Sequence, residues 1–215
     1  FSSMLQKGKI VVLNMNIAEY KNLSKIIAAY LKLDFQSEVM SNLSKSQVKP
    51  SVFICDEYAE YVTKTDADFF ALSREAKCIN IVSTQSYSSL KNTLKDDSSV
   101  KVIIQNLINK IWFRTDDIFT IEEAQKQLGK EEKTHISKAI SENAKETKFN
   151  YITNSFNSKN SSITESLNTY TQKDFVYDTN FFTQELETFS SLVFLSNGYK
   201  ILKPTKLRMF PYFKK

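Results

Sequence analysis

Glycine, proline and cysteine are all scarce in this 215-residue sequence, which contains three glycines, three prolines and two cysteines. With so few prolines and 41% hydrophobic residues, the composition predicts a folded chain built from long regular elements. Two thiols form neither a disulfide framework nor a zinc site. We therefore expect Cys55 and Cys78 to be small buried hydrophobic residues in a reducing, cytoplasmic setting.

Long apolar runs are also missing, because no stretch approaches the roughly 20 residues that span a bilayer. The first nine residues, FSSMLQKGK, do not have the pattern of a signal peptide. Since the chain starts with Phe1, we interpret it as a fragment, and any membrane anchor has to lie outside it.

Charge of one sign is modest, with a net charge of +5 and lysines that are mostly interleaved with acids. The exception is the C-terminal stretch, where basic residues occur without acids: Lys200, Lys203, Lys206, Arg208, Lys214 and Lys215. This stretch fits a solubilising tail, or a surface for a phosphate backbone or an anionic membrane.

The most informative stretch is residues 51–61, SVFICDEYAEY, in which an apolar run ends at two acids, Asp56 and Glu57. Such a run predicts a strand buried on both faces, as in the centre of a parallel sheet. The acids then lie at the rim where open α/β sheets bind ligands. Nucleotide-hydrolysing enzymes use this arrangement to hold magnesium and to position the attacking water. The alternative is a solvated turn or a helix N-cap.

Strand-like and helix-like segments alternate through the first 129 residues. The predicted strands cover residues 9–15, 51–55, 79–83 and 110–115, and the predicted helices cover 19–35, 66–77, 100–107 and 120–128. A capping box at Thr120 and Glu123 opens the last helix, which ends at Gly129. This alternation predicts an α/β fold with a mostly parallel sheet and helices on both faces.

The first of these helices has apolar residues at spacings of three and four, a pattern that extends through Val39 and Leu43. They are Leu23, Ile26, Ile27, Tyr30, Leu31 and Phe35. In the helix at residues 66–77, Asp66 is the predicted cap, and Phe69, Phe70 and Leu72 are expected to face the core.

Composition changes at residues 141–172, which are rich in Ser, Asn, Thr and Lys. We interpret them as a flexible polar insertion, first a solvated helix and then a loosely ordered loop, within one domain covering residues 1–215. After it, a short helix at 183–189 is expected. A C-terminal hairpin follows, turning at Asn197-Gly198 between residues 191–195 and 199–202, and residues 209–213 form a closing strand.

Two further polar residues follow from the predicted topology. Gln85 comes just after the strand at residues 79–83, so parallel strands would deliver Asp56, Glu57 and Gln85 to one rim. An amide there can hydrogen-bond a γ-phosphate or the attacking water. Arg74, near the end of the preceding helix, is of the type that stabilises a transferring phosphoryl group in trans. The alternatives are a helix-dipole partner for Arg74 and a loop cap for Gln85.

In their order, the strings KIVVLNM, FICDEY, LSREAKCINIVSTQSYSSL, NLINKIWFRT and QLG resemble type IV coupling proteins, the TraG/TraD-type ATPases of bacterial conjugation and type IV secretion. The short helix, SLVFLSNG and the basic closing strand extend the resemblance to the end of the chain. It implies a RecA-like P-loop NTPase motor that uses ATP and Mg²⁺, assembles as a homo-hexamer, and pumps DNA or hands on effectors.

Carried over by motif, the resemblance makes Asp56 the Walker B residue that holds Mg²⁺ through water, and Glu57 the catalytic carboxylate. Gln85 becomes the γ-phosphate sensor, and Arg74 a candidate arginine finger that reaches the neighbouring subunit. The phosphate-cradling motif G-x-x-x-x-G-K-[ST] is absent, since none of the three glycines fits it. The sequence therefore corresponds to the C-terminal part of the motor without its P-loop half, and we expect no ATP hydrolysis by this chain alone.

The resemblance also implies partners: DNA, a relaxase and relaxosome accessory proteins or effectors, and components of the type IV secretion channel. It implies a place in the bacterial cytoplasm, at the inner-membrane face. Candidate DNA contacts are Lys91 and Lys95 in residues 86–99, and the segment at 130–133, although either can be an ordinary exposed loop. The lone His135 lies in a polar stretch and is not expected to be a ligand.

Two other readings remain open. One is a docking module for relaxosome or effector proteins that has no catalysis of its own. The other is a different RecA-like translocase, such as an FtsK-like pump, against which the pairing of SREA with TQSYSSL argues.

Overall fold

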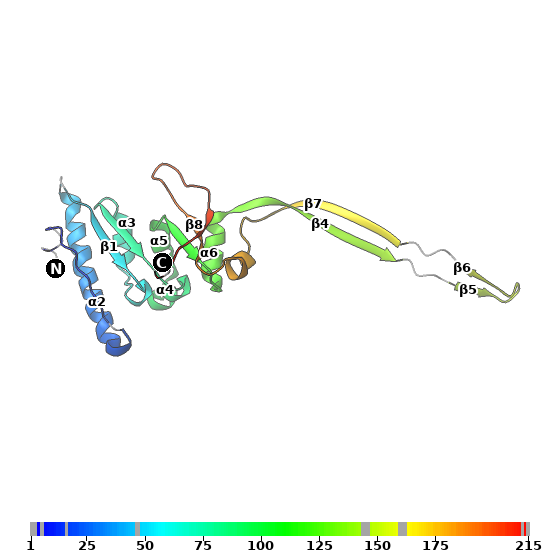
Figure 1. Cartoon of the computed structure of the whole chain (residues 1–215), viewed down its shortest axis with the longest axis horizontal. Helices are drawn as coiled ribbons and strands as arrows, with labels where there is room; N and C mark the ends of the chain where they lie inside the picture. Colours follow the sequence, from blue (N-terminus) through cyan, green and yellow to red (C-terminus); the bar gives the residue numbers. More distant parts are fainter. Residues whose placement is uncertain are drawn as a thin grey trace. The chain divides into compact units, whose positions relative to one another are not determined.

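The computed structural model describes Met4, residues 7–15, 17–45, 48–142, 147–158 and 163–211, and Phe213. The chain divides into two compact units (Figure 1). We call the first, Phe1–Ala124 with Thr179–Lys215, the α/β body, and the second, Gln125–Asp178, the ribbon unit. No helix in the described ranges is long and apolar enough to cross a membrane.

Two parallel strands form the first sheet of the α/β body. Strand β1 (Ser51–Cys55) pairs with β2 (Cys78–Val82) in a register that runs from Ser51 opposite Cys78 to Cys55 opposite Val82. The connection between them contains the short helices η2 (Tyr58–Glu60) and α3 (Asp66–Leu72). The strands predicted at residues 51–55 and 79–83 are confirmed, as is their parallel pairing.

A second, antiparallel sheet has the order β3-β8-β9. It contains β3 (Lys110–Phe113), β8 (Ser190–Phe194) and β9 (Thr205–Arg208). The expectation of a mostly parallel sheet is not met, because β1–β2 is the one parallel pair among the described strands. The α/β class itself stands.

Helices surround the first sheet and supply most of a hydrophobic core that includes residues of β1 and β2. They are α2 (Ile17–Met40) with η1 (Ser41–Ser44), α3, α4 (Tyr87–Leu94), α5 (Asp97–Asn106) and α6 (Ile118–Leu128). Phe35, Val39, Tyr58, Val100 and Ile103 are among the buried members of the core. Trp112 on β3, expected to be a packing residue, is 4% exposed.

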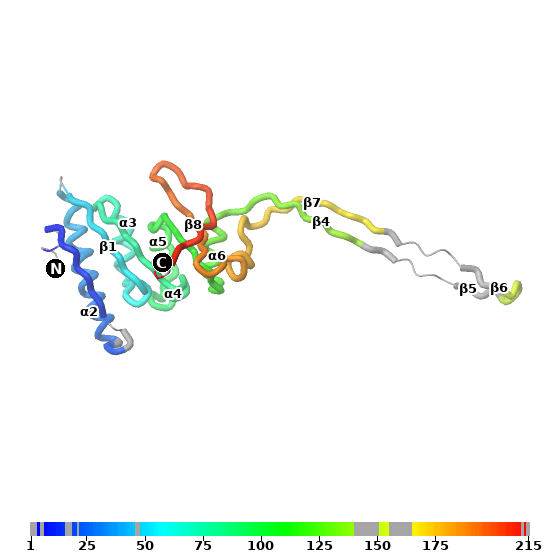
Figure 2. The backbone as a smooth tube through the Cα atoms, in the orientation of Figure 1, coloured from blue at the N-terminus to red at the C-terminus, as the bar shows by residue number. Residues whose placement is uncertain are grey.

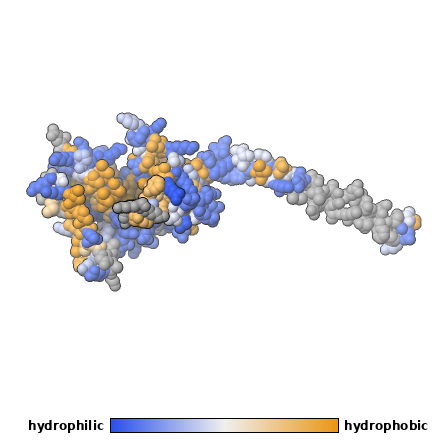
Figure 3. Space-filling model, viewed as in Figure 1, coloured by the Kyte–Doolittle hydropathy of each residue, from blue (hydrophilic) through white to orange (hydrophobic). Residues whose placement is uncertain are grey.

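Several predicted apolar faces are bare. Val52 and Ile54 of β1 are 51% and 71% exposed, so the prediction of a strand buried on both faces is wrong. Residues 9–15 form no strand in the structure, and Ile10 is 93% exposed. On α2, Leu23, Ile26 and Tyr30 are likewise exposed, whereas Phe35 and Val39 are buried. In the space-filling view, hydrophobic side chains are visible over this part of the α/β body (Figure 3).

Two helix boundaries differ from the predicted ones. Helix α3 ends at Leu72, which is 39% exposed rather than facing the core, and Arg74 falls in the turn that follows. Helix α6 is capped by Asp117, whose carboxylate accepts from the Thr120 amide at 2.9 Å, so Thr120 is not the cap. The predicted stop at Gly129 is confirmed, with φ at +81°, a conformation that glycine adopts without strain.

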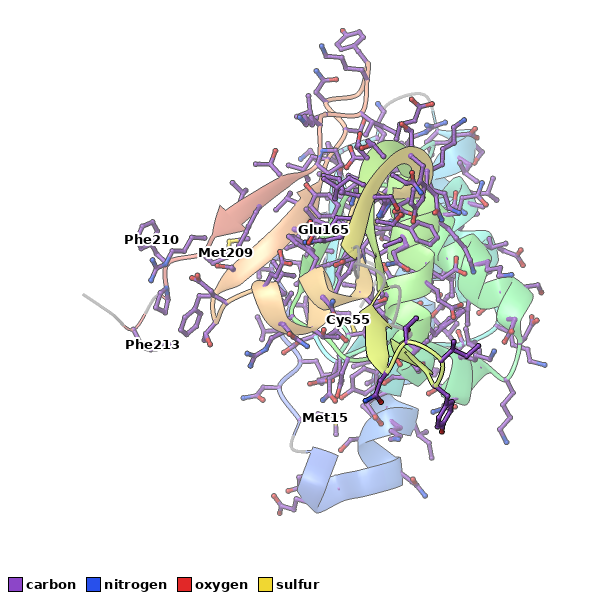
Figure 4. The ribbon with its side chains drawn as sticks, turned by 90° about the vertical axis from the view of Figure 1, so that its right-hand side faces the viewer. Met15, Cys55, Glu165, Met209, Phe210 and Phe213 are labelled. Carbon is purple, nitrogen blue, oxygen red and sulfur yellow. The ribbon has the colours of Figure 1, made fainter. Side chains whose placement is uncertain are left out.

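The C-terminal part of the α/β body begins with η3 (Phe181–Glu185), a π-helical turn where a short helix was expected. The hairpin at Asn197-Gly198 exists, but its second strand, β9, starts only at Thr205. The closing strand expected at 209–213 is not formed by its described residues. Figure 4 labels Met209, Phe210 and Phe213 beyond β9.

The ribbon unit is built on a long antiparallel ladder between β4 (Lys130–Glu142) and β7 (Ile163–Phe175), which run side by side in Figure 2. A second short ladder joins β5 (Thr147–Asn150) to β6 (Ser155–Ser158). The prediction of a helix followed by a loop in residues 141–172 is therefore wrong over the described residues. Residues 143–146 and 159–162 of that segment lie outside them.

Candidate functional site

The parallel pairing of β1 and β2 brings the polar residues that follow them to one edge. Because Cys55 lies opposite Val82, Asp56 and Glu57 emerge beside Ser83 and Gln85. Figure 4 labels Cys55, the last residue of β1 before this edge. Two backbone hydrogen bonds continue beyond the ladder, from Ser83 N–H to the Cys55 carbonyl at 3.0 Å and from Tyr58 N–H to the Ser83 carbonyl at 2.8 Å. The two connecting segments are thus fixed to each other.

Side chains join the two segments as well. The Gln85 amide Nε2 donates to both Glu57 carboxylate oxygens, at 3.2 and 3.4 Å. The Ser83 hydroxyl donates to Asp56 Oδ1, which also accepts the Glu57 backbone N–H at 3.0 Å. We call this group, Asp56, Glu57, Ser83 and Gln85, the rim cluster. The structure therefore brings together three of the four residues that the sequence singled out.

Glu57 has a left-handed backbone conformation, with φ at 47° and ψ at 43°. Such a conformation is uncommon for a residue with a side chain and typically costs about 1 kcal/mol or more. The hydrogen bonds on either side of Glu57 hold it there. The result is a sharp change of chain direction that leaves the Asp56 and Glu57 carboxylates at the end of the strand rather than along its side.

The Asp56 carboxylate has one oxygen that is available to a metal ion or its water. Both of its described hydrogen bonds go to Oδ1, and no donor in the described part of the chain reaches Oδ2. A free carboxylate oxygen at an exposed position is the kind of ligand that Mg²⁺ takes, commonly through its own water shell. The residues present therefore fit a hydrated Mg²⁺.

Arg74 is not part of the rim cluster. It is exposed and lies in the turn that precedes β2, whereas Gln85 follows the other end of that strand. Five strand residues rise roughly 16 Å at about 3.3 Å each, so Arg74 and Gln85 lie at opposite ends of β2. Within one chain, Arg74 does not meet the carboxylates.

The DNA-contact candidates are not on loops. Lys91 belongs to α4, where its ammonium pairs with Asp97 at 2.8 Å and lies over the Phe119 ring at 5.2 Å. Lys95 is the exposed C-cap of the same helix. In the ribbon unit, Lys130 lies over the Phe175 ring at 4.8 Å, and Lys133 lies 3.8 Å from Glu131. Most of these lysines are thus already engaged by neighbouring side chains.

A cleft of about 730 Å³ opens next to Gln85, between the N-terminal ends of α4 and α6. Its lining comprises Gln85, Ser86, Ser88, Ser89, Thr115, Asp116, Asp117, Ile118, Phe119 and Glu122. The volume is within the range of small-molecule sites. However, three carboxylates in the wall would repel a polyphosphate, so we do not assign a nucleotide to this cleft.

The cysteines are free, and burial raises the pKa of Cys55 to about 11 and that of Cys78 to about 12. They are therefore inert at neutral pH. Cys78 is buried, as expected, whereas Cys55 is only partly buried. Within the described residues, no group of three or more His, Cys, Asp or Glu side chains is suited to hold a metal ion.

Sequence reasoning missed Ser83 because it counted Ser83 as the last residue of the predicted strand at 79–83, whereas β2 ends at Val82. It also took Asp66 for a helix cap. In the structure, Asp66 is 0% exposed and binds Lys32 at 2.5 Å. No local pattern predicts that pairing, because the two residues are 34 positions apart.

Comparison with known proteins places this sequence in a family. Residues 50–176 match the family model described as the TraM recognition site of TraD and TraG. The chain therefore belongs to this family and represents a C-terminal region of TraG/TraD-type coupling proteins, as the resemblance predicted.

Among solved structures, the chain is similar to the bacterial conjugative coupling protein TrwBdeltaN70 in its unbound monoclinic form, with a TM-score of 0.55 and 14% identity. The match covers 86% of this chain and 37% of the TrwBdeltaN70 chain. At that identity the likeness concerns the fold, and it supports an α/β architecture. A comparison with curated protein sequences finds no match.

Proposed function

We propose that this chain supplies the Walker B and sensor part of an ATP-driven coupling-protein motor, which delivers DNA or protein effectors to a type IV secretion channel. The observation that carries the proposal is the contact between Gln85 and Glu57 at the shared end of two parallel strands. A carboxylate pair with a neutral amide on the adjacent strand is the arrangement that phosphoryl-transfer motors use. The phosphate-cradling loop would come from another segment of the coupling protein.

Each residue of the rim cluster has a role in this proposal. Asp56, through its free Oδ2, would hold Mg²⁺ by way of water, and Glu57 would orient and deprotonate the attacking water. Gln85 would exchange its bond to Glu57 for one to the γ-phosphate, and so report whether the phosphate is present. Bound MgATP would supply the phosphoryl group for transfer.

Arg74 fits a role in trans better than one in cis. Because it lies at the far end of β2 and is exposed, it would reach the nucleotide of a neighbouring subunit only in a ring, such as the proposed homo-hexamer. The ring would lie at the cytoplasmic face of the inner membrane and hold DNA in its channel, with Lys91 and Lys95 as candidate contacts.

The test is steady-state ATP hydrolysis by the complete coupling protein that contains this region. Glu57→Gln is expected to lower kcat by at least about 100-fold because it removes the general base. Asp116→Asn, an exposed carboxylate in the neighbouring cleft, is the matched control and should leave kcat within twofold. Turnover unchanged in Glu57→Gln would refute the motor assignment. The 215-residue chain alone is expected to show none.

A docking function is the second candidate, and the family description favours it. The matched range, residues 50–176, includes the rim cluster and nearly all of the ribbon unit. The partner would be a relaxosome accessory protein. Because Val176 N–H binds the Gly129 carbonyl at 3.2 Å, residues 130–175 can be replaced by a Ser-Gly turn without opening the base of the ribbon. Capture of the accessory protein by the intact chain, lost on this replacement and indifferent to nucleotide, would support docking.

A further inference from the structure

A charged network is buried in the core of the α/β body. The Asp66 carboxylate is fully buried and accepts from Lys32 Nζ at 2.5 Å, from the Tyr58 hydroxyl at 2.6 Å and from Gln36 Nε2 at 3.0 Å. The backbone N–H and the hydroxyl of Thr63 complete the set, at 3.1 and 2.9 Å. Lys32 is 5% exposed, and its ammonium also donates to the Tyr61 carbonyl at 2.7 Å.

The donors around Asp66 keep it ionised. Burial by itself raises the pKa of this carboxyl, but the Lys32 charge and the hydrogen bonds from Lys32, Tyr58 and Gln36 outweigh that effect and leave the pKa below its ordinary value. Well-packed apolar residues in place of a buried ion pair often give equal or greater stability. The network is therefore poorly explained as a device for stability alone.

The network leads directly to the rim cluster. Tyr58 is the residue after Glu57, and it is held at both ends. Its N–H binds the Ser83 carbonyl, its ring packs edge-on against Phe70 at 5.8 Å, and its hydroxyl binds Asp66. Glu57 is not a glycine, so its left-handed conformation is strained and has to be held in place. Any movement of Tyr58 would release it.

We propose that Tyr58, Asp66 and Lys32 are positioning residues that hold the Glu57 carboxylate against Gln85, and that they tie the rim cluster to α2. This inference rests on the proposed function for its catalytic meaning, but its structural content is independent of it. Lys32 lies on α2, Asp66 begins α3, and Tyr58 begins η2, so one buried carboxylate ties three elements to the loop that carries Glu57.

Tyr58→Phe is the sharpest variant, because it removes the hydroxyl and keeps the ring and the Lys32–Asp66 ion pair. Tyr61→Phe is the matched control: it removes a hydroxyl three positions along the chain and leaves the network intact. The first measurement is amide hydrogen exchange in the 215-residue chain. Tyr58→Phe should raise the exchange rates of the Tyr58 and Ser83 amides at least tenfold and leave that of Leu192 in β8 unchanged, and Tyr61→Phe should change none of the three.

The second measurement is kinetic, in the complete coupling protein. Tyr58→Phe should lower kcat for ATP about tenfold with KM within twofold, since it misplaces the carboxylate without touching nucleotide contacts. A purely structural role would instead lower the folded fraction and leave kcat per folded molecule unchanged.

The outcomes separate the two claims. Unchanged exchange at Tyr58 and Ser83 in Tyr58→Phe would overturn the positioning inference. If exchange rises at these sites but the wild-type complete protein hydrolyses no ATP, the positioning of Glu57 stands and the motor assignment falls. Raised exchange with an unchanged kcat would overturn the catalytic meaning of the network.

Discussion

The α/β body and the ribbon unit are stabilised in different ways. The body contains fully buried side chains such as Tyr58, Phe182 and Leu192, and it buries a complete ionic network. In the ribbon unit, Gln125 is the one buried residue among those whose side chains are described. Its ladder is supported instead by side-chain pairs, including His135 stacked on Tyr170 at 5.5 Å and paired with Asp174 at 2.5 Å. Contacts between polar and aromatic side chains therefore stabilise the ribbon unit, and the packing of buried side chains stabilises the α/β body.

The largest loss of stability in the α/β body is expected from Lys32→Met. It leaves the Asp66 charge buried without its cation, which typically costs about 3–5 kcal/mol. Urea unfolding followed by tryptophan fluorescence reports on the body through Trp112. Lys25→Met is the control: its ion pair with Glu60 is 45% and 41% exposed, and such pairs contribute about 0–1 kcal/mol. Equal midpoints for the two variants would contradict the network.

The stability that the ion pair of Lys32 with Asp66 contributes depends on pH. Because the Asp66 pKa is lowered in the folded state, its contribution is fully present above the unfolded value of about 4 and is lost as the pH falls through the folded value. Wild type should therefore lose more stability than an Asp66→Asn variant as the pH falls below about 4. Parallel pH profiles would count against an ionised Asp66.

Matched leucines give the next largest contrast. Leu192 in β8 is 0% exposed and Leu167 in β7 is 66% exposed. Leu192→Ala should lower the free energy of unfolding by about 3 kcal/mol, whereas Leu167→Ala should change it by less than about 0.5 kcal/mol. Similar losses would show that the ribbon is packed against a surface in solution.

Lys110 is a buried amine whose removal should stabilise the body. It is 7% exposed, and burial lowers its pKa from 10.5 to about 8. Since the unfolded chain holds the proton up to a higher pH, wild-type stability should rise between about pH 8 and pH 10. Lys110→Met should add about 1 kcal/mol at pH 7 and remove that rise. Lys101→Met, at an exposed site on α5, should do neither.

The smallest effect concerns the ribbon alone. Tyr170→Ala removes the stack on His135 and should weaken the ladder by about 0.5 kcal/mol. Amide exchange should rise along β4 and β7 and not in β1 or β8. Thr171→Ala, one position along β7 on its other face, is the control. A response in β8 would mean that the two units are energetically coupled.

The sequence indicated the rim cluster because strand ends are local features. A run such as Val52–Cys55 predicts a strand, and parallel pairing then places the following residues side by side. Ser83 was missed because the predicted strand ran one residue past the end of β2. The ion pair of Lys32 with Asp66 was missed for a different reason. Its two residues are 34 positions apart, and no periodicity specifies which distant donor reaches a buried carboxylate.

The ribbon and the bare faces show a second limit. Ser-, Thr- and Asn-rich sequence has weak preference for any element, so residues 141–172 carried no period that predicts strands. Apolar periodicity on α2 was correct, but it predicts which residues share a face and not whether anything covers that face. Ile26 and Tyr30 therefore follow the expected pattern and remain exposed.

The bond from Gln85 to Glu57 has a consequence for how the motor would start its cycle. In this state the Gln85 amide and the Glu57 carboxylate are hydrogen-bonded to each other, so a phosphate or a water that binds either group must first displace the other. In the proposed motor, hydrolysis would then be blocked until a bound nucleotide or a partner breaks the contact between Gln85 and Glu57.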